Sequence, residues 1–376
     1  MTNLRRMMMA AAGAAGGGAA TEGYLATWGD GATGQLGTGS TVDTSSPVNV
    51  GSDENWTFAV ASNPQQSFGL KADYTMWGMG RNTAGYPLGN SGAYGNVSSP
   101  VQISSGENWL SLAGGVNSHA AVTTDYKLFT WGRGDFGRLG NGTTSGSVQV
   151  PTQIGALTDW LWVTGGYSTF AAVKTDGKLW TWGSGTSGEL GDGADSNRCS
   201  PVNVGSLTNW HRVNIGTGNT MTALKTDGTI WSWGAGGGGA LGHSNTTSYC
   251  SPVQIGAATD WAYIATGKER GAAINTAGKL YTWGDNTNGE LGLGTTTGMS
   301  SPSQVGTDVD WAKIFMGKLM TFATKTDGTL WSWGNPNAYG LLGDLTGVAR
   351  SSPVQVGALS WVMADVYHKS AVGIHE

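Results

Sequence analysis

The chain has 376 residues, of which 64 are glycine and 18 are tryptophan, with 12% charged residues and a formal net charge of -5. An apolar content of 39% is enough for a packed core, so the glycine content does not indicate disorder. The dispersed lysines and arginines form no basic stripe, which argues against direct nucleic-acid binding, and no run approaches the roughly 18 apolar residues of a membrane span.

Residues 1–22 form a segment of low complexity that precedes the first strand signal. Arg5 and Arg6 are followed by a run of methionine, alanine and glycine, which resembles a secretory signal only superficially because the run lacks Leu, Ile, Val and Phe. A Gly/Ala-rich terminus stays disordered unless a partner holds it. We expect either an uninformative tail or a docking arm, whose contact residues are Leu4, Arg5, Arg6, Met7 and Met8.

The rest of the chain repeats with a period of about 50 residues, which indicates a repeat architecture. Seven Trp-Gly pairs begin at Trp28, Trp77, Trp131, Trp182, Trp233, Trp283 and Trp333. A second tryptophan column consists of Trp56, Trp109, Trp160, Trp210, Trp261, Trp311 and Trp361. A proline column and a Leu-Gly column recur in the same seven registers.

One period contains four strand signals. In residues 200–234, extended runs follow Pro201 and Trp210, and two more cover 221–225 and 229–233. Asp227-Gly228, between the last two runs, predicts a type I′ hairpin turn, in which both central residues need a positive φ. Each period is therefore expected to fold as a four-stranded antiparallel unit.

Seven such units predict an all-β chain folded as a seven-bladed β-propeller over residues 23–376. We expect the two tryptophan columns to fill the wedges between blades, each ring burying on the order of 200 Å². The chain ends on the third strand of a repeat, and the missing fourth strand lies at residues 23–29. We therefore expect strand 23–29 to pair with strand 369–375 and close the ring.

Trp-Gly, Gly-x-Leu-Gly, Pro-Val and Thr-Asp-Gly-x-Leu-Trp-x-Trp-Gly, repeated about every 50 residues, resemble the regulator-of-chromosome-condensation repeat family. The resemblance covers residues 23–376 and implies the seven-bladed fold, but not one function, since that fold carries nucleotide exchange, chromatin docking, enzyme inhibition and ubiquitin-pathway roles. The family's exchange factor uses an inserted wedge and basic segments. The repeat spacing leaves no room for the wedge and the basic segments are absent, so exchange activity is not expected.

The start of the chain, RRMMMAAAG followed by glycines, is similar to the N-termini of many tailed-phage virion proteins. This resemblance implies a non-enzymatic structural or host-attachment component of a phage virion, located on the extracellular particle. Residues 1–22 would dock on other virion proteins, and the propeller would face outward toward a host-surface glycan or protein. The alternative is a free bacterial propeller, secreted or cytoplasmic, that inhibits or scaffolds a partner protein.

Residues 131–140, WGRGDFGRLG, contain two spellings of known functional signals. Gly132, Gly134 and Gly137 match the dinucleotide-binding G-x-G-x-x-G, but no amphipathic helix pattern follows, and the same spelling recurs after three other tryptophans. Arg133-Gly134-Asp135 spells an adhesion tripeptide at a position where other repeats carry unrelated residues. We interpret both as features of the repeat.

The sequence contains no catalytic or metal-binding constellation. The five histidines share no metal spacing, and Asp159, Asp260 and Asp310 precede the second tryptophan as turn formers. Cys199 and Cys250 are expected to be free thiols, because equivalent places in neighbouring repeats are too far apart to bridge. We therefore expect no enzyme activity, no cofactor and no metal.

A binding site is expected where the repeat columns break down. By the family resemblance, the loop after the second tryptophan strand lies near the central channel, so its residues would form an exposed ring on one face. The candidates are His119, Tyr167, Met221, Lys268, Glu269, Arg270, Lys318, Tyr367 and His368. Ordinary variable turns are the alternative interpretation, and the loops 91–97 and 145–149 before Pro-Val are a second candidate site.

Overall fold

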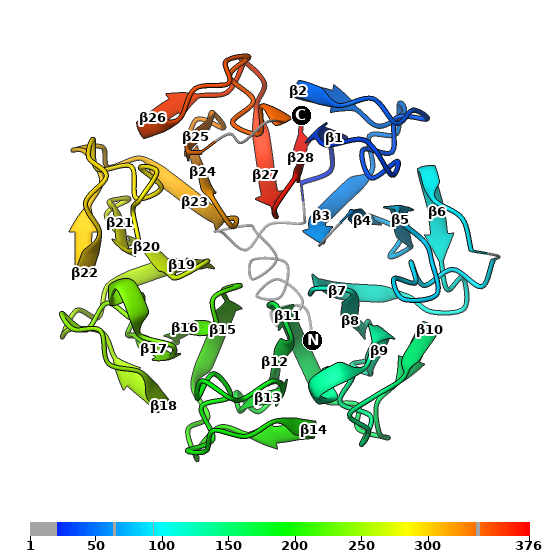
Figure 1. Ribbon diagram of the computed structural model, residues 1–376, viewed down its shortest axis with the longest axis horizontal. Helices are drawn as coiled ribbons and strands as arrows, with labels where there is room; N and C mark the ends of the chain where they lie inside the picture. Colours follow the sequence, from blue (N-terminus) through cyan, green and yellow to red (C-terminus); the bar gives the residue numbers. More distant parts are fainter. Residues whose placement is uncertain (1–20, 63–64, 93, 336–338) are drawn as a thin grey trace.

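The computed structural model describes residues 21–62, 65–92, 94–335 and 339–376, and these form seven four-stranded antiparallel sheets around a central axis (Figure 1). The predicted seven-bladed all-β propeller is confirmed. The described residues contain short 3₁₀ turns, such as η1 (Asp135–Gly137) and η2 (Gly237–Gly239).

Each blade has four strands, which follow one another from the channel outward. The first three blades are β3 (Trp56–Ser62), β4 (Gln66–Lys71), β5 (Met76–Gly80) and β6 (Val97–Ile103); β7 (Trp109–Gly114), β8 (Ser118–Thr123), β9 (Leu128–Arg133) and β10 (Ser147–Gln153); β11 (Trp160–Gly165), β12 (Thr169–Lys174), β13 (Leu179–Gly183) and β14 (Arg198–Asn203). The next three are β15 (Trp210–Ile215), β16 (Thr220–Lys225), β17 (Ile230–Gly234) and β18 (Tyr249–Gln254); β19 (Trp261–Gly267), β20 (Arg270–Asn275), β21 (Leu280–Gly284) and β22 (Met299–Gln304); β23 (Trp311–Met316), β24 (Met320–Lys325), β25 (Leu330–Gly334) and β26 (Arg350–Gln355).

The seventh blade joins the two ends of the chain. Its strands are β27 (Trp361–Val366), β28 (Ser370–His375), β1 (Tyr24–Gly29) and β2 (Thr44–Asn49). Strands β1 and β28 pair antiparallel from Tyr24↔His375 to Gly29↔Ser370, which confirms the predicted closure. Closing the ring within one sheet pairs strands from the two ends of the chain, so β1 lies in the interior of this sheet.

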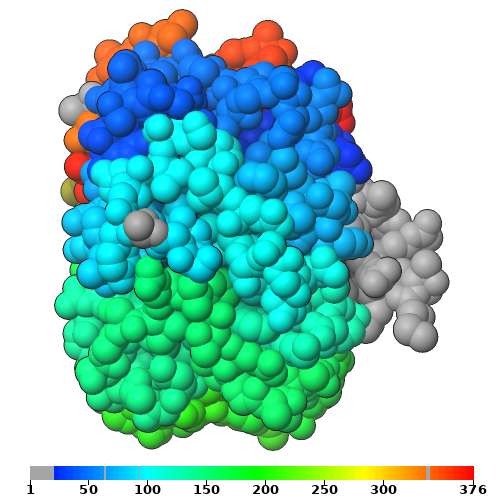
Figure 2. All heavy atoms as spheres, turned by 90° about the vertical axis from the view of Figure 1, so that its right-hand side faces the viewer, coloured from blue at the N-terminus to red at the C-terminus, as the bar shows by residue number. Residues whose placement is uncertain are grey.

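Six indole groups each tie one blade to the preceding one. In each case a fully buried tryptophan on the third strand donates from Nε1 to a backbone carbonyl in the loop after the third strand of the preceding blade, as Trp233 does to Glu189 at 3.0 Å. The equivalent bonds come from Trp28, Trp131, Trp182, Trp283 and Trp333, at 2.8–3.2 Å. In Figure 2 the side chains of neighbouring blades form a continuous outer wall.

The seventh position of this column is Met79, not the predicted Trp77. Met79 pairs with Ser67 as Trp131 pairs with His119, whereas Trp77 pairs with Gly69, two residues away along the strand pair. Trp77 is half-buried and donates from its indole to Thr75 Oγ1 at 2.8 Å. The assignment was wrong because the Trp-Gly spelling in the first blade is displaced by two residues.

The second tryptophan column is buried, as expected. Its members begin the inner strands, and each donates its backbone N–H to a carbonyl of the neighbouring blade, which lies in a hairpin turn except for Gly23, the acceptor for Trp56; Trp210, for example, donates to Gly177 at 3.1 Å. The equivalent donors are Trp56, Trp109, Trp160, Trp261, Trp311 and Trp361. Adjacent blades are therefore joined at both ends of the propeller.

The hairpin turns are not of the predicted type I′. At Asp227-Gly228 only the glycine has a positive φ, of 77°, and Gly228 N–H donates to Lys225 O at 3.1 Å. This is a type I turn followed by a left-handed residue. The aspartate favours that geometry because its Oδ1 accepts from the backbone N–H of Thr229 at 3.0 Å. In two blades a tyrosine, Tyr74 or Tyr126, occupies the left-handed position.

We expect Trp233→Phe to lower the free energy of unfolding by about 1–3 kcal/mol, because it leaves the buried Glu189 carbonyl without its donor. The matched control is Trp231→Phe. Its half-buried indole donates to Thr229 Oγ1 within its own hairpin, so its loss should stay below about 1 kcal/mol. Urea denaturation of the two variants measures the difference, and equal losses would refute a special role for the bond between blades.

Candidate functional site

A central channel runs along the axis of the propeller. Residues of the seven inner strands, β3, β7, β11, β15, β19, β23 and β27, line a cavity of about 160 Å³. Sequence reasoning placed the candidate site on the loops and did not single out this wall. The signal was present, because the residue two places after each inner tryptophan does not follow the repeat.

Seven residues of the inner strands lie at one level, because all inner strands share the same register with their second strands, and five of them, all except Ser111 and Lys313, line the cavity. Phe58↔Leu70 on β3 and β4 corresponds to Arg212↔Leu224 on β15 and β16. We call this set the channel layer; it consists of Phe58, Ser111, Trp162, Arg212, Tyr263, Lys313 and Met363. The layer therefore combines two cations with three aromatic rings.

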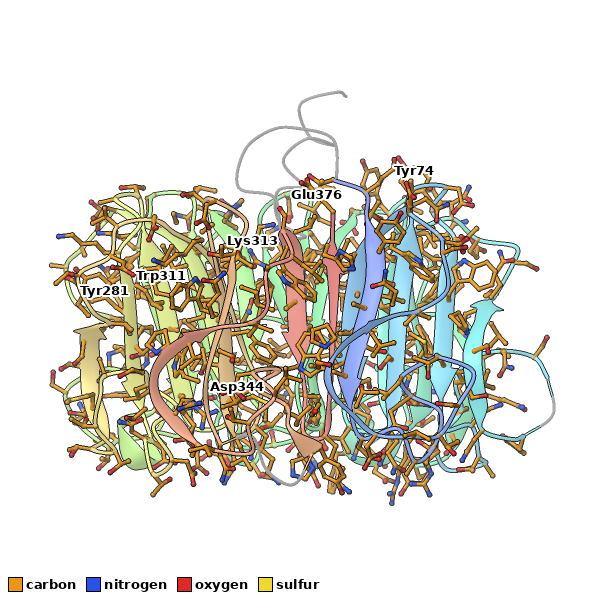
Figure 3. All side chains as sticks on the ribbon, turned by 90° about the horizontal axis from the view of Figure 1, so that it is seen from above. Tyr74, Tyr281, Trp311, Lys313, Asp344 and Glu376 are labelled. Carbon is orange, nitrogen blue, oxygen red and sulfur yellow. The ribbon has the colours of Figure 1, made fainter. Side chains whose placement is uncertain are left out.

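The two cations are held by different groups. The Arg212 guanidinium lies 4.1 Å from the centroid of the Tyr263 ring and donates from Nη2 to Tyr263 Oη at 3.1 Å. Lys313 donates from Nζ to the carbonyl of Val362 at 2.6 Å. Burial, and after it the positive charge of Arg212, lower the pKa of Lys313 to about 8. Figure 3 shows Lys313 toward the end of the propeller that carries Tyr74 and Glu376.

Asp365 is an acid in the channel wall. It lies on β27, two residues beyond Met363, and its Oδ2 accepts the backbone N–H of Ala61 on β3 at 3.0 Å. Burial raises the pKa of Asp365 to about 6, although backbone N–H groups of Ala61 and Val366 stabilise the carboxylate. The group therefore titrates in the mildly acidic range.

We call the opposite end of the propeller, which carries Asp344 in Figure 3, the loop face. It consists of the turns after the inner strands, such as 166–168, and the loops after the third strands, such as 134–146. Six of the nine predicted ring residues lie exposed or half-buried on these turns: Tyr167, Lys268, Glu269, Lys318, Tyr367 and His368. A binding role for them stays a prediction.

The other three predicted ring residues are buried and do not belong to an exposed ring. His119, Met221 and Arg270 are each at most 1% exposed. They are the first or second residues of the next strand, where side chains point between blades: His119 and Met221 pair with Trp131 and Trp233. His119 contacts Gln66 Oε1 through Nε2 at 2.9 Å, and burial lowers its pKa to about 3, so it is neutral.

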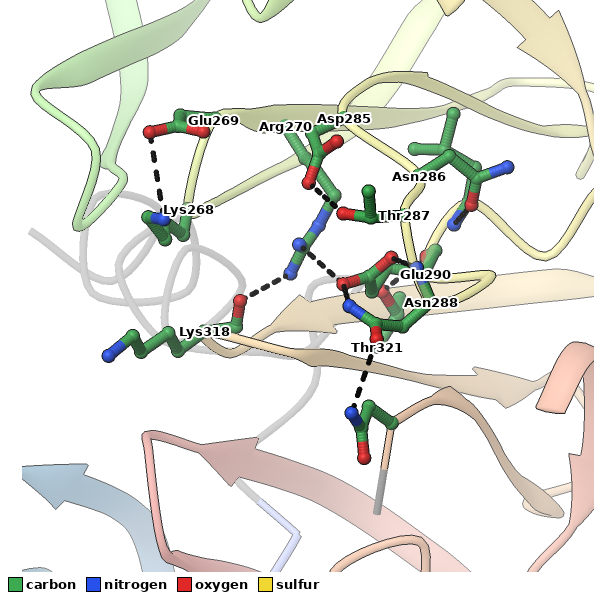
Figure 4. A network of polar contacts seen from close by, with 12 residues as sticks. Lys268, Glu269, Arg270, Asp285, Asn286, Thr287, Asn288, Glu290, Lys318 and Thr321 are labelled. Atoms are coloured by element: carbon green, nitrogen blue, oxygen red, sulfur yellow. Dashed lines mark hydrogen bonds and ion pairs between the residues drawn. The ribbon is translucent and has the colours of Figure 1, made fainter. Parts of the chain in front are cut away.

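Arg270 organises a polar network under the loop face (Figure 4). Its Nη1 lies 3.4 Å from Glu290 Oε1, in an ion pair that is 1% exposed on both sides. Its Nη2 donates to the carbonyls of Gly317 and Lys318 in the neighbouring blade, at 3.0 and 3.1 Å. Arg270 is therefore a positioning residue, which fixes the turn that carries Lys318.

A groove of about 500 Å³ opens on the loop face between the second and third blades. Phe136 and Tyr167 line it, and these two aromatic residues are 48% and 50% exposed. Phe136 has φ 61° and ψ 12°, a left-handed conformation that the equivalent loop of η2 gives to Gly238 (φ 64°). A bulky residue in this region costs about 1–2 kcal/mol.

The two motif-like sequences within residues 131–140, G-x-G-x-x-G and Arg-Gly-Asp, both lie in this loop. Arg133 Nε forms an ion pair with Asp135 within the tripeptide, and both side chains line the groove. The residues after Gly137 lead to strand β10, not to the helix that a dinucleotide site needs. Neither spelling has the context of its motif.

The remaining candidates lie away from this groove. Gln149, from the second set of candidate loops, donates to the Gly92 carbonyl of the neighbouring blade at 3.5 Å; residue 93 lies outside the described residues.

Cys199 and Cys250 are free thiols, as predicted. The described ranges contain no group of three or more metal-ligating side chains, and no helix among them is long and apolar enough to cross a membrane. Residues 1–20, including Leu4 to Met8, lie outside the described residues.

The sequence profile of the regulator of chromosome condensation (RCC1) repeat matches residues 22–62, 126–173, 176–224, 227–274 and 277–324. The chain belongs to the RCC1 repeat family. The unmatched stretch 63–125 includes the blade in which Met79 occupies the tryptophan position.

Two RCC1 relatives show how far this membership extends. RUG3, a mitochondrial RCC1 domain-containing protein of Arabidopsis thaliana, is 33% identical over 272 residues, which cover 67% of this chain and 59% of RUG3. The human E3 ubiquitin-protein ligase HERC2 is 31% identical over 191 residues, 50% of this chain and 4% of HERC2. The chain thus spans only part of these relatives, and their activities are not carried over.

Among solved structures, Prp20p from Saccharomyces cerevisiae is similar with a TM-score of 0.86 and 16% identity, over 99% of this chain and 94% of Prp20p. At that identity the likeness shows the fold alone.

We expect Asp365→Asn to stabilise the protein near neutral pH. Because the folded-state pKa of Asp365 is raised from 3.8 to about 6, the wild type loses stability as the pH rises through this range, by about 3 kcal/mol. The amide can still accept the Ala61 N–H. Thermal melts at about pH 4 and about pH 8 should show similar Tm values at the lower pH and a higher Tm for the variant at the upper. A pH-independent difference would contradict this account.

Proposed function

We propose that this RCC1-repeat protein is a non-enzymatic propeller that binds a partner protein through its loop face. The support is family membership together with the groove between the second and third blades. The structure of Prp20p was described with its binding properties to Gsp1p and histones, so a propeller of this fold serves as a protein-binding surface there. A shared fold supports protein binding by this chain only by analogy, so the argument for binding rests on the residues of the groove.

The observation that carries the proposal is the conformation and exposure of Phe136. Its left-handed backbone costs free energy, and its exposed ring does not recover that cost by burial in the propeller. The Arg138 guanidinium lies 5.5 Å from this ring, and Tyr167 is exposed beside the same groove. Exposed aromatic rings next to arginine are the residues that dominate protein–protein interfaces.

The half-buried ring residues extend this surface around the channel mouth. Lys268 and Glu269 pair at 3.7 Å, and Lys318 Nζ lies 3.4 Å from His368 Nε2. These mixed charges suit the polar rim of an interface around an aromatic centre. The partner would therefore present an apolar group to the groove and polar groups to the rim.

A narrower form of the proposal makes the partners virion proteins, with residues 1–22 as the docking arm and 23–376 as the displayed propeller. Its support is the composition of that arm, in particular Leu4, Arg5, Arg6, Met7 and Met8. Mass spectrometry of purified phage particles from the source sample tests it. We expect the chain at a fixed copy number per particle, and its absence from the particles would contradict the virion role while leaving the loop face untouched.

We expect Phe136→Gly to weaken partner binding about 30-fold or more, as removal of a central aromatic anchor does. The same change relieves the left-handed strain, so the Tm should stay equal or rise, which separates lost binding from lost folding. A photo-crosslinking amino acid at position 136 first captures the partner from source extract, and interferometry then measures its affinity for each variant.

Leu157→Ser is the matched control for this experiment. Leu157 is 49% exposed and lies before β11, whereas Tyr167 follows that strand, so the two residues lie at opposite ends of the propeller. The control should keep wild-type affinity. If Leu157→Ser weakens binding and Phe136→Gly does not, the loop face is not the interface.

A further inference from the structure

We propose that the channel binds a small organic anion, a carboxylate carried on a single ring, at Arg212. This ligand site shares no lining residue with the groove beside Phe136. It rests on the charges, the unpaired donors and the size of the channel.

The charge of the channel layer is not compensated. Among the described residues neither Arg212 nor Lys313 forms an ion pair with Asp or Glu, and the layer itself contains no acid. Asp365, the acid among the cavity-lining residues, is held by the Ala61 N–H, and burial disfavours its carboxylate. Arg212 therefore lines the partly desolvated cavity without a paired carboxylate, which favours an anionic ligand.

Three donors on neighbouring blades are unpaired. Within the described part of the chain no acceptor meets Arg212 Nε, Trp162 Nε1 or the Ser111 hydroxyl, and these residues are 9%, 9% and 3% exposed. Arg212 and Trp162 both line the channel cavity, unlike the inner tryptophans whose indoles are also unpaired. A buried donor without an acceptor costs about 1–3 kcal/mol, so a carboxylate that accepts from Arg212 Nε recovers part of this cost.

The aromatic residues of the channel wall favour a ligand whose carboxylate is attached to a ring. Phe58 and Trp162 lie edge to face with centroids 6.4 Å apart, and Tyr263 and Phe315 do so at 6.5 Å. The cavity of about 160 Å³ is close to the roughly 150 Å³ that holds a benzene molecule in an engineered protein cavity. One ring with one carboxylate therefore matches both the space and the charge.

Isothermal titration calorimetry on the full chain tests this with benzoate, benzamide and inorganic phosphate. Benzamide keeps the ring without the charge, and phosphate keeps the charge without the ring. We expect benzoate to bind at least about tenfold more tightly than either, and Arg212→Met to weaken benzoate binding about tenfold or more. Lys178→Met, which removes a partly exposed charge paired with Asp176, should leave the affinity unchanged.

A second readout guards against misfolded variants. With ¹⁵N-arginine labelling, benzoate should shift an Nε–H signal in the wild type that is absent from Arg212→Lys, while circular dichroism shows each variant to be folded. Absence of benzoate binding up to about 10 mM by the folded wild type would overturn the proposal. Equal affinity for benzamide or phosphate, or unchanged binding by folded Arg212→Met, would also overturn it.

Discussion

An indole N–H donated to a carbonyl of the preceding blade is the interaction on which the propeller depends most. A single four-stranded sheet cannot bury both of its faces, so the blades are stable only when packed against each other. The loop must therefore approach the indole closely. At Gly191 (φ 69°) a Cβ would lie 2.5 Å from Trp233 Nε1, so both the backbone conformation and the contact require glycine.

This constraint fixes the backbone of the Gly-x-Leu-Gly loop but leaves its second side chain free. The bond uses the carbonyl of that residue in five cases, and the side chains there range from basic to acidic and apolar: Arg138, Glu189, Ala240, Glu290 and Leu341. The Arg138 side chain donates from Nη1 to the Val116 carbonyl at 2.7 Å. Glu290 instead pairs with Arg270. The chain thus varies its loop face without changing the bond between blades.

The sequence predicts correctly those features that are encoded in all seven repeats. The fold, the strand order and the ring closure follow from columns of tryptophan, proline and Leu-Gly, where errors in one repeat are corrected by the others. Single positions lack this redundancy. Trp77 was assigned to the wrong column because one blade carries Met79 at the tryptophan position. His119, Met221 and Arg270 were assigned to a loop because only one or two residues separate the turn from a buried position on the next strand. The channel layer was missed because its residues share a register, not a residue type.

The two variable regions are connected through one strand. Trp162 in the channel layer and Tyr167 at the groove are five residues apart along β11 and the turn that follows, which corresponds to about 16 Å of extended chain. Backbone bonds pair this strand with β12 from Trp160 to Gly165, so it cannot shift without breaking its own blade. Lys318 and Tyr367 of the loop-face turns also line the channel cavity, whereas the groove beside Phe136 shares no lining residue with it. The paired strands therefore hold the groove and the channel layer at a fixed separation, while the channel mouth opens among the turns of the loop face.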